Sequence, residues 1–149
     1  MDFIQILYII IGSFLGFGFA LIAEFALTQV KKHFDALKAK SNINDELIHI
    51  YHDFYNEERK QIRTEEIYFD TPIWNSVVST GDILIMLNKN KNFNAYYNKV
   101  MDIYGKLKAI DKMQSANKSD YEEDIYNAKK YVVDLIRDKD ILNISEAVK

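Results

Sequence analysis

An uncharged apolar stretch near the N-terminus limits this chain more than any other feature of its sequence. From Ile6 to Ala23 the sequence reads ILYIIIGSFLGFGFALIA, with no charged residue. At a rise of 1.5 Å per residue, a helix of this length crosses the hydrocarbon core of a bilayer. A soluble domain of this size has too little core to cover such a helix on all sides. We therefore predict a transmembrane helix over residues 1–30.

A cleaved secretory signal peptide is the main alternative to a retained span. Such a peptide needs basic residues before a shorter apolar core, and a small-x-small cleavage site after it. Here the N-terminus carries Asp2 and no basic residue, and Glu24 and Phe25 follow the apolar core. An amphipathic surface helix would need a polar face, which the stretch lacks.

The charges that flank the span predict its orientation. Lys31, Lys32, Lys38 and Lys40 follow the apolar stretch, whereas no basic residue precedes it. The positive-inside rule therefore places the C-terminal part in the cytoplasm, with a short N-terminus outside the inner membrane. The chain has no cysteine, which fits a reducing compartment.

Small residues inside the span predict helix association. Gly12 and Gly16 form a GxxxG pair, with Ser13 and Gly18 beside it. Small residues four apart let two helix backbones approach closely in lipid. Glycine is also common in membrane helices in general. Both interpretations stay open, and we expect a self-association face.

The residues after the span predict one water-soluble domain over residues 31–140 and a frayed tail over residues 141–149. All 19 Lys and Arg residues, and all but two of the 22 Asp and Glu residues, lie after residue 30. The domain is thus nearly neutral and provides no field for nucleic acid. The expected partners are the lipid bilayer and either further copies of the chain or another protein.

Apolar spacing predicts that the domain is an all-α bundle of three long helices and one short one. The first long helix should run from Asn44 to about Arg63, separated from the membrane helix by capping side chains at residues 41–44. A short helix should begin near Pro72, with Asp70 or Thr71 as its cap. Gly81 is placed to end it in a left-handed conformation.

Two further long helices should form an antiparallel hairpin at the C-terminal end. The first begins after a loop at residues 88–92, which follows a short apolar helix or strand at residues 82–87. A four-residue connection at residues 116–119 joins the two helices. Ser119 or Asp120 is the expected cap of the second.

The short helix carries a recognisable pattern. Residues 71–83 (TPIWNSVVSTGDI) read Thr-x-x-Trp-x-Ser-x-x-Ser-x-Gly, with Thr71, Trp74, Ser76, Ser79 and Gly81 at the named positions. Together with the span, this segment resembles a family of small single-span bacterial and phage membrane proteins. The resemblance implies a helical cytoplasmic part and assigns no catalytic residues. The residues themselves suggest a structural corner anchored by the tryptophan, or alternatively a pocket for a partner.

Groups suited to catalysis or metal binding are few. Glu46, His49 and Asp53 share one helix face by spacing, and His52 follows one turn on. A di-metal bundle needs a second such motif and two further carboxylates, which the sequence lacks. The sequence also lacks a phosphate loop, a dinucleotide fingerprint and a nucleophile elbow. We therefore expect no metal, no cofactor and no enzymatic activity.

These features predict a non-enzymatic, membrane-anchored helical protein. It would self-associate, or bind a protein partner through its cytoplasmic domain, or do both. The alternative function is an oligomeric membrane-perturbing effector, for example in a bacterial phage-defence or toxin-like system.

Overall fold

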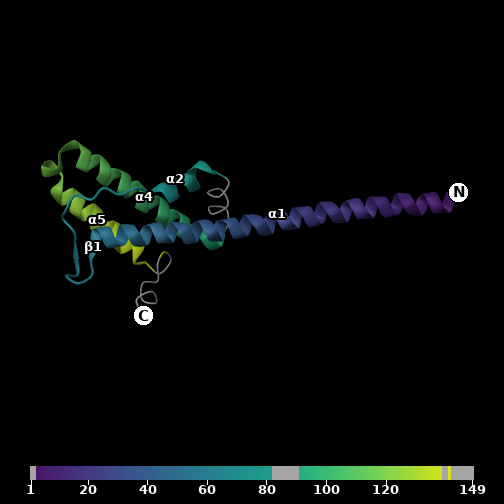
Figure 1. Cartoon of the computed structure of the whole chain (residues 1–149), viewed down its shortest axis with the longest axis horizontal. Coiled ribbons are helices and arrows are strands. Elements are labelled where there is room, and N and C mark those ends of the chain that lie inside the picture. Colours follow the sequence, from purple (N-terminus) through teal and green to yellow (C-terminus); the bar gives the residue numbers. More distant parts are fainter. Residues whose placement is uncertain (1–2, 82–90, 139–140, 142–149) are drawn as a thin grey trace. The chain divides into compact units, whose positions relative to one another are not determined.

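The computed structural model describes residues 3–81, 91–138 and 141 (Figure 1). There the chain is mostly helical, with one small hairpin and an irregular segment over residues 63–71. In chain order the elements are α1 (Phe3–Phe54), β1 (Tyr55–Asn56), β2 (Gln61–Ile62), α2 (Pro72–Ser79), α4 (Lys91–Asn117), the 3-10 helix η1 (Lys118–Asp120) and α5 (Glu122–Ile136). The all-α prediction is therefore confirmed. The chain divides into two compact units, Met1–Leu37 and Lys38–Lys149.

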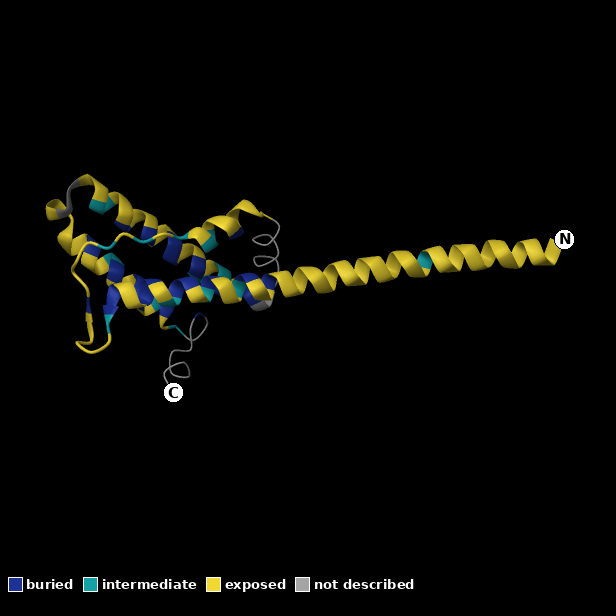
Figure 2. Cartoon of the chain, viewed as in Figure 1, coloured by how far each residue is buried: buried dark blue, intermediate teal, exposed yellow. Residues whose placement is uncertain are grey.

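The first unit consists of the apolar part of α1. This helix is long and apolar enough to cross a membrane, and no residue of its most apolar window is buried. Its bulky side chains are open to the surroundings: Phe14 is 75% exposed and Phe19 is 70% exposed. Figure 2 shows this exposed length of α1. The apolar stretch of α1 is thus exposed, unlike the core helix of a soluble protein, which is mostly buried.

The expected break at residues 41–44 is absent, since α1 continues from Phe3 to Phe54. Polar residues without Gly or Pro cost a helix interior only a few tenths of a kcal/mol each. The Asn44 side chain makes tertiary bonds instead of capping a new helix. Its Nδ2 donates to the Ile141 carbonyl at 3.3 Å, and its Oδ1 accepts from the Tyr96 hydroxyl at 2.8 Å.

The first helix of the domain also ends earlier than predicted, at Phe54 instead of Arg63. A short antiparallel hairpin follows, in which Tyr55 pairs with Ile62. The turn is fixed by a bond from the Arg59 N–H to Asn56 Oδ1 at 2.9 Å, and Lys60 adopts a positive φ of 51°. Asparagine bonds its own backbone in this way at turns, and that bond competes with helix propagation.

Helices α4 and α5 form the predicted hairpin and pack against each other (Figure 1). The loop expected at residues 88–92 is wrong at its last two positions, because α4 begins at Lys91; residues 82–90 lie outside the described residues. The N-cap of α5 is Tyr121, which makes no side-chain cap bond, so the predicted cap was misplaced. Glu122, Glu123 and Asp124 fill the first turn, where the helix dipole favours negative charge.

The domain core joins the last turns of α1 to α4, α5 and α2. Its buried apolar side chains include Ile43, Leu47, Ile50, Phe54, Val77, Val100, Ile103, Leu107, Ile110, Ile125, Val132, Val133 and Ile136. Ile141, assigned by sequence to a frayed tail, is 4% exposed and belongs to this core. Residues 142–149 lie outside the described residues.

A buried lysine fixes the irregular segment between the hairpin and α2. Lys129 of α5 is 1% exposed, and its ammonium donates to the Glu65 carbonyl at 2.7 Å and to the Arg63 carbonyl at 3.2 Å. The ammonium also lies 5.4 Å from the centre of the Phe54 ring. Charged groups are seldom buried without such bonds. Lys129 therefore ties residues 63–65 to the helical core.

Candidate functional site

The candidate site lies where the irregular segment before α2 and the start of α2 meet α4. Pro72 occupies the first turn of α2, as its fixed φ favours. Thr71 occupies the N-cap position, but its side chain makes no cap bond. The cap predicted from local sequence is therefore absent, and the free N–H groups of α2 are bonded by a residue far away in the chain.

That residue is Glu46 of α1, which is only 5% exposed. Its carboxylate accepts the backbone N–H of Ile73 at 2.8 Å and that of Trp74 at 3.3 Å. The Tyr104 hydroxyl of α4 donates to the same carboxylate. A negative group at a helix N-terminus satisfies both the free donors and the helix dipole. Glu46 thereby joins α1, α2 and α4 at one point.

An aromatic stack reinforces this junction. The rings of Trp74 and Tyr104 lie parallel within 5°, with centroids 4.2 Å apart. Burial, and next the bond to Glu46, raise the pKa of the Tyr104 phenol far above its usual value. The phenol therefore stays protonated and keeps its role as a donor. Trp74 anchors the short helix to α4 through this contact.

The hydroxyls of α2 bond the local backbone. Ser79 Oγ donates to the Ser76 carbonyl at 2.7 Å, and Thr80 Oγ1 donates to the Val77 carbonyl at 2.9 Å. Gly81 follows with a positive φ of 29°, a conformation that favours glycine. These groups finish the helix and lie on its exposed side.

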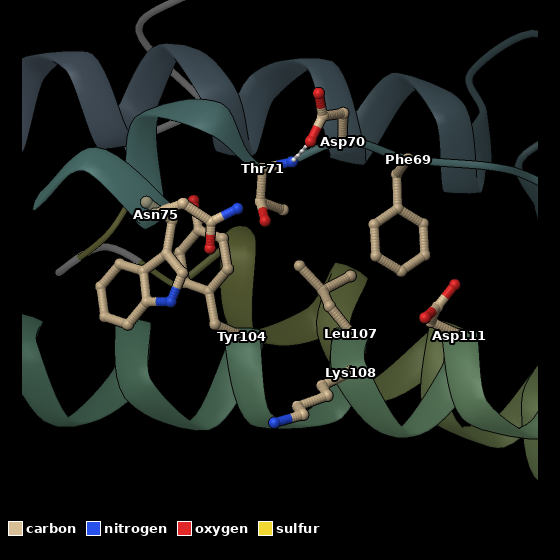
Figure 3. A pocket seen from close by; sticks show the side chains of 9 residues that line it. Phe69, Asp70, Thr71, Asn75, Tyr104, Leu107, Lys108 and Asp111 are labelled. Atoms are coloured by element: carbon tan, nitrogen blue, oxygen red, sulfur yellow. Dashed lines mark hydrogen bonds between the residues drawn. The ribbon is translucent and has the colours of Figure 1, made fainter. Parts of the chain in front are cut away.

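A pocket of about 360 Å³ opens between α4 and the segment from Phe69 to Asn75 (Figure 3). Its lining comprises Phe69, Asp70, Thr71, Trp74, Asn75, Tyr104, Leu107, Lys108 and Asp111. Thr71 and Trp74 are thus the two members of the predicted set that reach the pocket. Ser76, Ser79 and Gly81 do not line it, so the sequence pattern combines a pocket wall with a helix end.

The histidine-containing face of α1 does not converge on a site. Glu46 points into the junction, whereas His49, His52 and Asp53 are exposed. Among the described residues, no group of three His, Asp or Glu side chains is arranged to hold a metal ion.

A second cavity of about 700 Å³ is lined by Arg63, Glu65, Glu122, Glu123 and Lys129, among others. The Lys129 ammonium donates to the backbone carbonyls of Arg63 and Glu65.

The small residues of the predicted association face have free space beside them. Apart from the chain neighbours and the adjacent backbone of the same helix, no atom of the described residues lies within 4 Å of a Cβ added at Gly12, Gly16 or Gly18. The hydroxyl of Ser13 donates to the Ile9 carbonyl at 2.8 Å, which satisfies it within its own helix. The four residues can therefore receive a closely approaching backbone without the loss of an existing contact.

Sequence reasoning missed the role of Glu46 and that of Lys129. One signal was present for each: both lie in register with the apolar stripe of their helix, Glu46 between Ile43 and Leu47, and Lys129 between Ile125 and Val132. A charged residue at a stripe position is either paired in the core or marks a break in the pattern. Its partners come from other elements, which spacing cannot identify.

Comparison of the chain with protein-family models, with curated proteins and with solved structures gives no match.

Replacement Glu46→Gln removes the charge and one acceptor from the α2 N-terminus. We expect a loss of about 1–3 kcal/mol in the free energy of unfolding, because buried donors lose their partner. The emission of Trp74, the only tryptophan, should shift to longer wavelength as its ring becomes wetter. His49→Gln, at an exposed position of the same helix, is the control. An unchanged denaturant midpoint and emission for Glu46→Gln would contradict the junction.

The buried phenols predict a loss of stability at alkaline pH. Burial, and then the bond to Glu57, raise the pKa of Tyr51 to about 12; burial raises the pKa of Tyr96 as well as that of Tyr104. The folded state therefore holds these protons more tightly than the unfolded state, so stability is constant below about pH 10 and falls above it. Denaturant midpoints on both sides of that pH measure the loss. The double variant Tyr96→Phe, Tyr104→Phe should show a weaker pH slope; an equal slope would contradict the assignment.

Proposed function

We propose that this chain is a non-enzymatic, single-span membrane protein that self-associates through its span and carries a helical domain for a partner. The observation that supports the proposal most is the unburied apolar length of α1. Phenylalanine, leucine and isoleucine side chains surround the helix, and each costs about 1.5–3 kcal/mol when left in water. A lipid bilayer relieves that cost along the whole length.

The proposed orientation places the chain from residue 31 onward in the cytoplasm, and it depends on the basic residues after the span. Lys31, Lys32 and Lys38 are exposed and lie within the first turns beyond the apolar length. Lys40 lies 4.7 Å from the centre of the Tyr96 ring, where it contributes to the fold of the domain as well as to the charge. Such a cluster favours the cytoplasmic side of the inner membrane.

Two buried ionisable groups, Glu46 and Lys129, have structural roles, and this supports a non-enzymatic function. Glu46 bonds the N-terminus of α2, and Lys129 bonds the carbonyls of residues 63 and 65. An active site needs ionisable groups that face a substrate, and these two face the protein backbone instead. The domain therefore provides rigid surfaces and pockets for recognition.

Membrane fractionation tests the anchoring. The intact chain should sediment with membranes and resist an alkaline wash, because its retention depends on burial in lipid. A double variant, Leu15→Arg and Phe19→Arg, places two charges in the hydrocarbon core and should release most of the protein to the soluble fraction. Two arginines at exposed domain positions, Ala109→Arg and Asn127→Arg, control for added charge. Full-length, unmodified chain in the supernatant without detergent would overturn the proposal.

Cysteine cross-linking tests the self-association, since the native chain has no cysteine of its own. A single cysteine at Ser13 should form a disulfide-linked dimer in native membranes upon mild oxidation. Adding Gly12→Leu and Gly16→Leu should lower the dimer yield several-fold, because bulky side chains hold the backbones apart. Ile10→Leu and Phe17→Leu in the same background should leave the yield unchanged. An equal yield in all three proteins would rule out this face.

A further inference from the structure

The pocket beside α2 has the size of a small-molecule site and a lining that is mainly polar and charged. Leu107 forms its floor, with the ring of Phe69 on one side and that of Tyr104 on the other (Figure 3). Its volume of about 360 Å³ falls in the range typical of ligand pockets. Polar and charged side chains make up more of its lining than is usual for such pockets, so a ligand for it must itself be charged. The junction at Glu46 holds two of its walls, α2 and Tyr104, in place. The pocket is therefore preformed by the fold.

One end of the pocket is suited to a cation. The Asp111 carboxylate lies beside the ring of Phe69 in Figure 3, and Asp70 lies near that end above it. Among the described residues, the Asp111 carboxylate has no hydrogen-bond or ion-pair partner. A carboxylate next to an aromatic ring binds a guanidinium or ammonium group through both charge and the ring face.

The other end of the pocket is suited to an anion. The Lys108 side chain extends away from Asp111 along α4, and the Asn75 amide lies on the same side as the ring of Tyr104 (Figure 3). Neither side chain has a hydrogen-bond or ion-pair partner among the described residues. In Figure 3 the Asn75 amide lies above the ring of Tyr104 and the Lys108 ammonium lies below it, so the ammonium alone is the donor for a carboxylate at this end. The pocket is thus charged in opposite senses at its two ends.

We propose that this pocket binds a dipolar ligand, in which a guanidinium or ammonium group and a carboxylate are carried on one apolar stem. The cationic group would pair with Asp111 beside Phe69, the stem would lie on Leu107, and the carboxylate would meet Lys108. The C-terminal basic residue of a partner has this chemistry. A free basic amino acid carries the same two groups and, in addition, an α-ammonium next to the carboxylate. A purely cationic ligand would leave Lys108 unpaired, and a purely apolar one would leave both ends unpaired.

The fluorescence of Trp74 provides the test, because it lines the pocket and is the only tryptophan. The full chain in detergent micelles is titrated with L-arginine, with agmatine, which lacks the carboxylate, and with a peptide ending in arginine. Sodium chloride at equal ionic strength controls for screening. We expect a saturable change with L-arginine and a weaker affinity for agmatine by roughly fivefold, the size of one exposed ion pair. Tighter binding of the peptide than of the free amino acid identifies a partner's C-terminus as the source, and the reverse order identifies the metabolite.

Two charge-neutralising variants separate the ends of the pocket. Asp111→Asn should weaken arginine binding, and so should Lys108→Gln, each by roughly fivefold. Lys108→Gln should also abolish the difference between arginine and agmatine. Asp134→Asn and Lys112→Gln, at exposed positions outside the pocket, should bind as the native chain does, and circular dichroism checks that all four fold. No saturable change with any of the three ligands, or equal affinity in Asp111→Asn, overturns the proposal. Binding here does not require α1 to enter a bilayer, so failure of this test leaves the anchoring proposal intact.

Discussion

The apolar side chains along the first part of α1 are exposed, and this exposure determines the environment that the protein needs. Among the described residues, none in the most apolar stretch of this helix is buried, although its backbone bonds are formed within the helix. Exposure of such a surface to water is unfavourable. A segment that crosses a bilayer needs apolar side chains and backbone hydrogen bonds that are all formed within the segment, and this helix has both. The core cluster of the second unit draws its described residues from Ala39 onward.

That core is small, and two buried charges hold its irregular parts. Glu46 bonds the start of α2, and Lys129 bonds the segment that leads to it. Each forms charge-assisted hydrogen bonds to backbone groups that would otherwise lack partners. The pocket between α2 and α4 is a consequence of the first of these bonds, because Glu46 sets the position of both Trp74 and Tyr104.

Sequence reasoning recovered the features that depend on local pattern. The apolar helix, the helix at Pro72, the left-handed Gly81 and the α4–α5 hairpin all follow from spacing and from residue-specific backbone preferences. The continuous helix through residues 41–44 was missed because Asn44 is held by Tyr96 and Ile141, which lie more than fifty residues away. The α2 cap was misassigned for the same reason: Thr71 is at the right position, yet a buried carboxylate from another helix takes its role. The family resemblance and the function remain predictions.

Water access along α1 distinguishes a helix in lipid from a helix in water. Single cysteines at Leu15 and at the exposed His49 are placed in the otherwise cysteine-free chain, which is then reconstituted in lipid vesicles. A water-soluble maleimide is added to opened vesicles, so that both faces of the membrane are reached. If the helix spans the bilayer, we expect rapid labelling of the cysteine at residue 49. The cysteine at residue 15 should not be labelled until detergent is added, because it lies in hydrocarbon. Equal labelling of the two positions in intact bilayers would contradict this expectation.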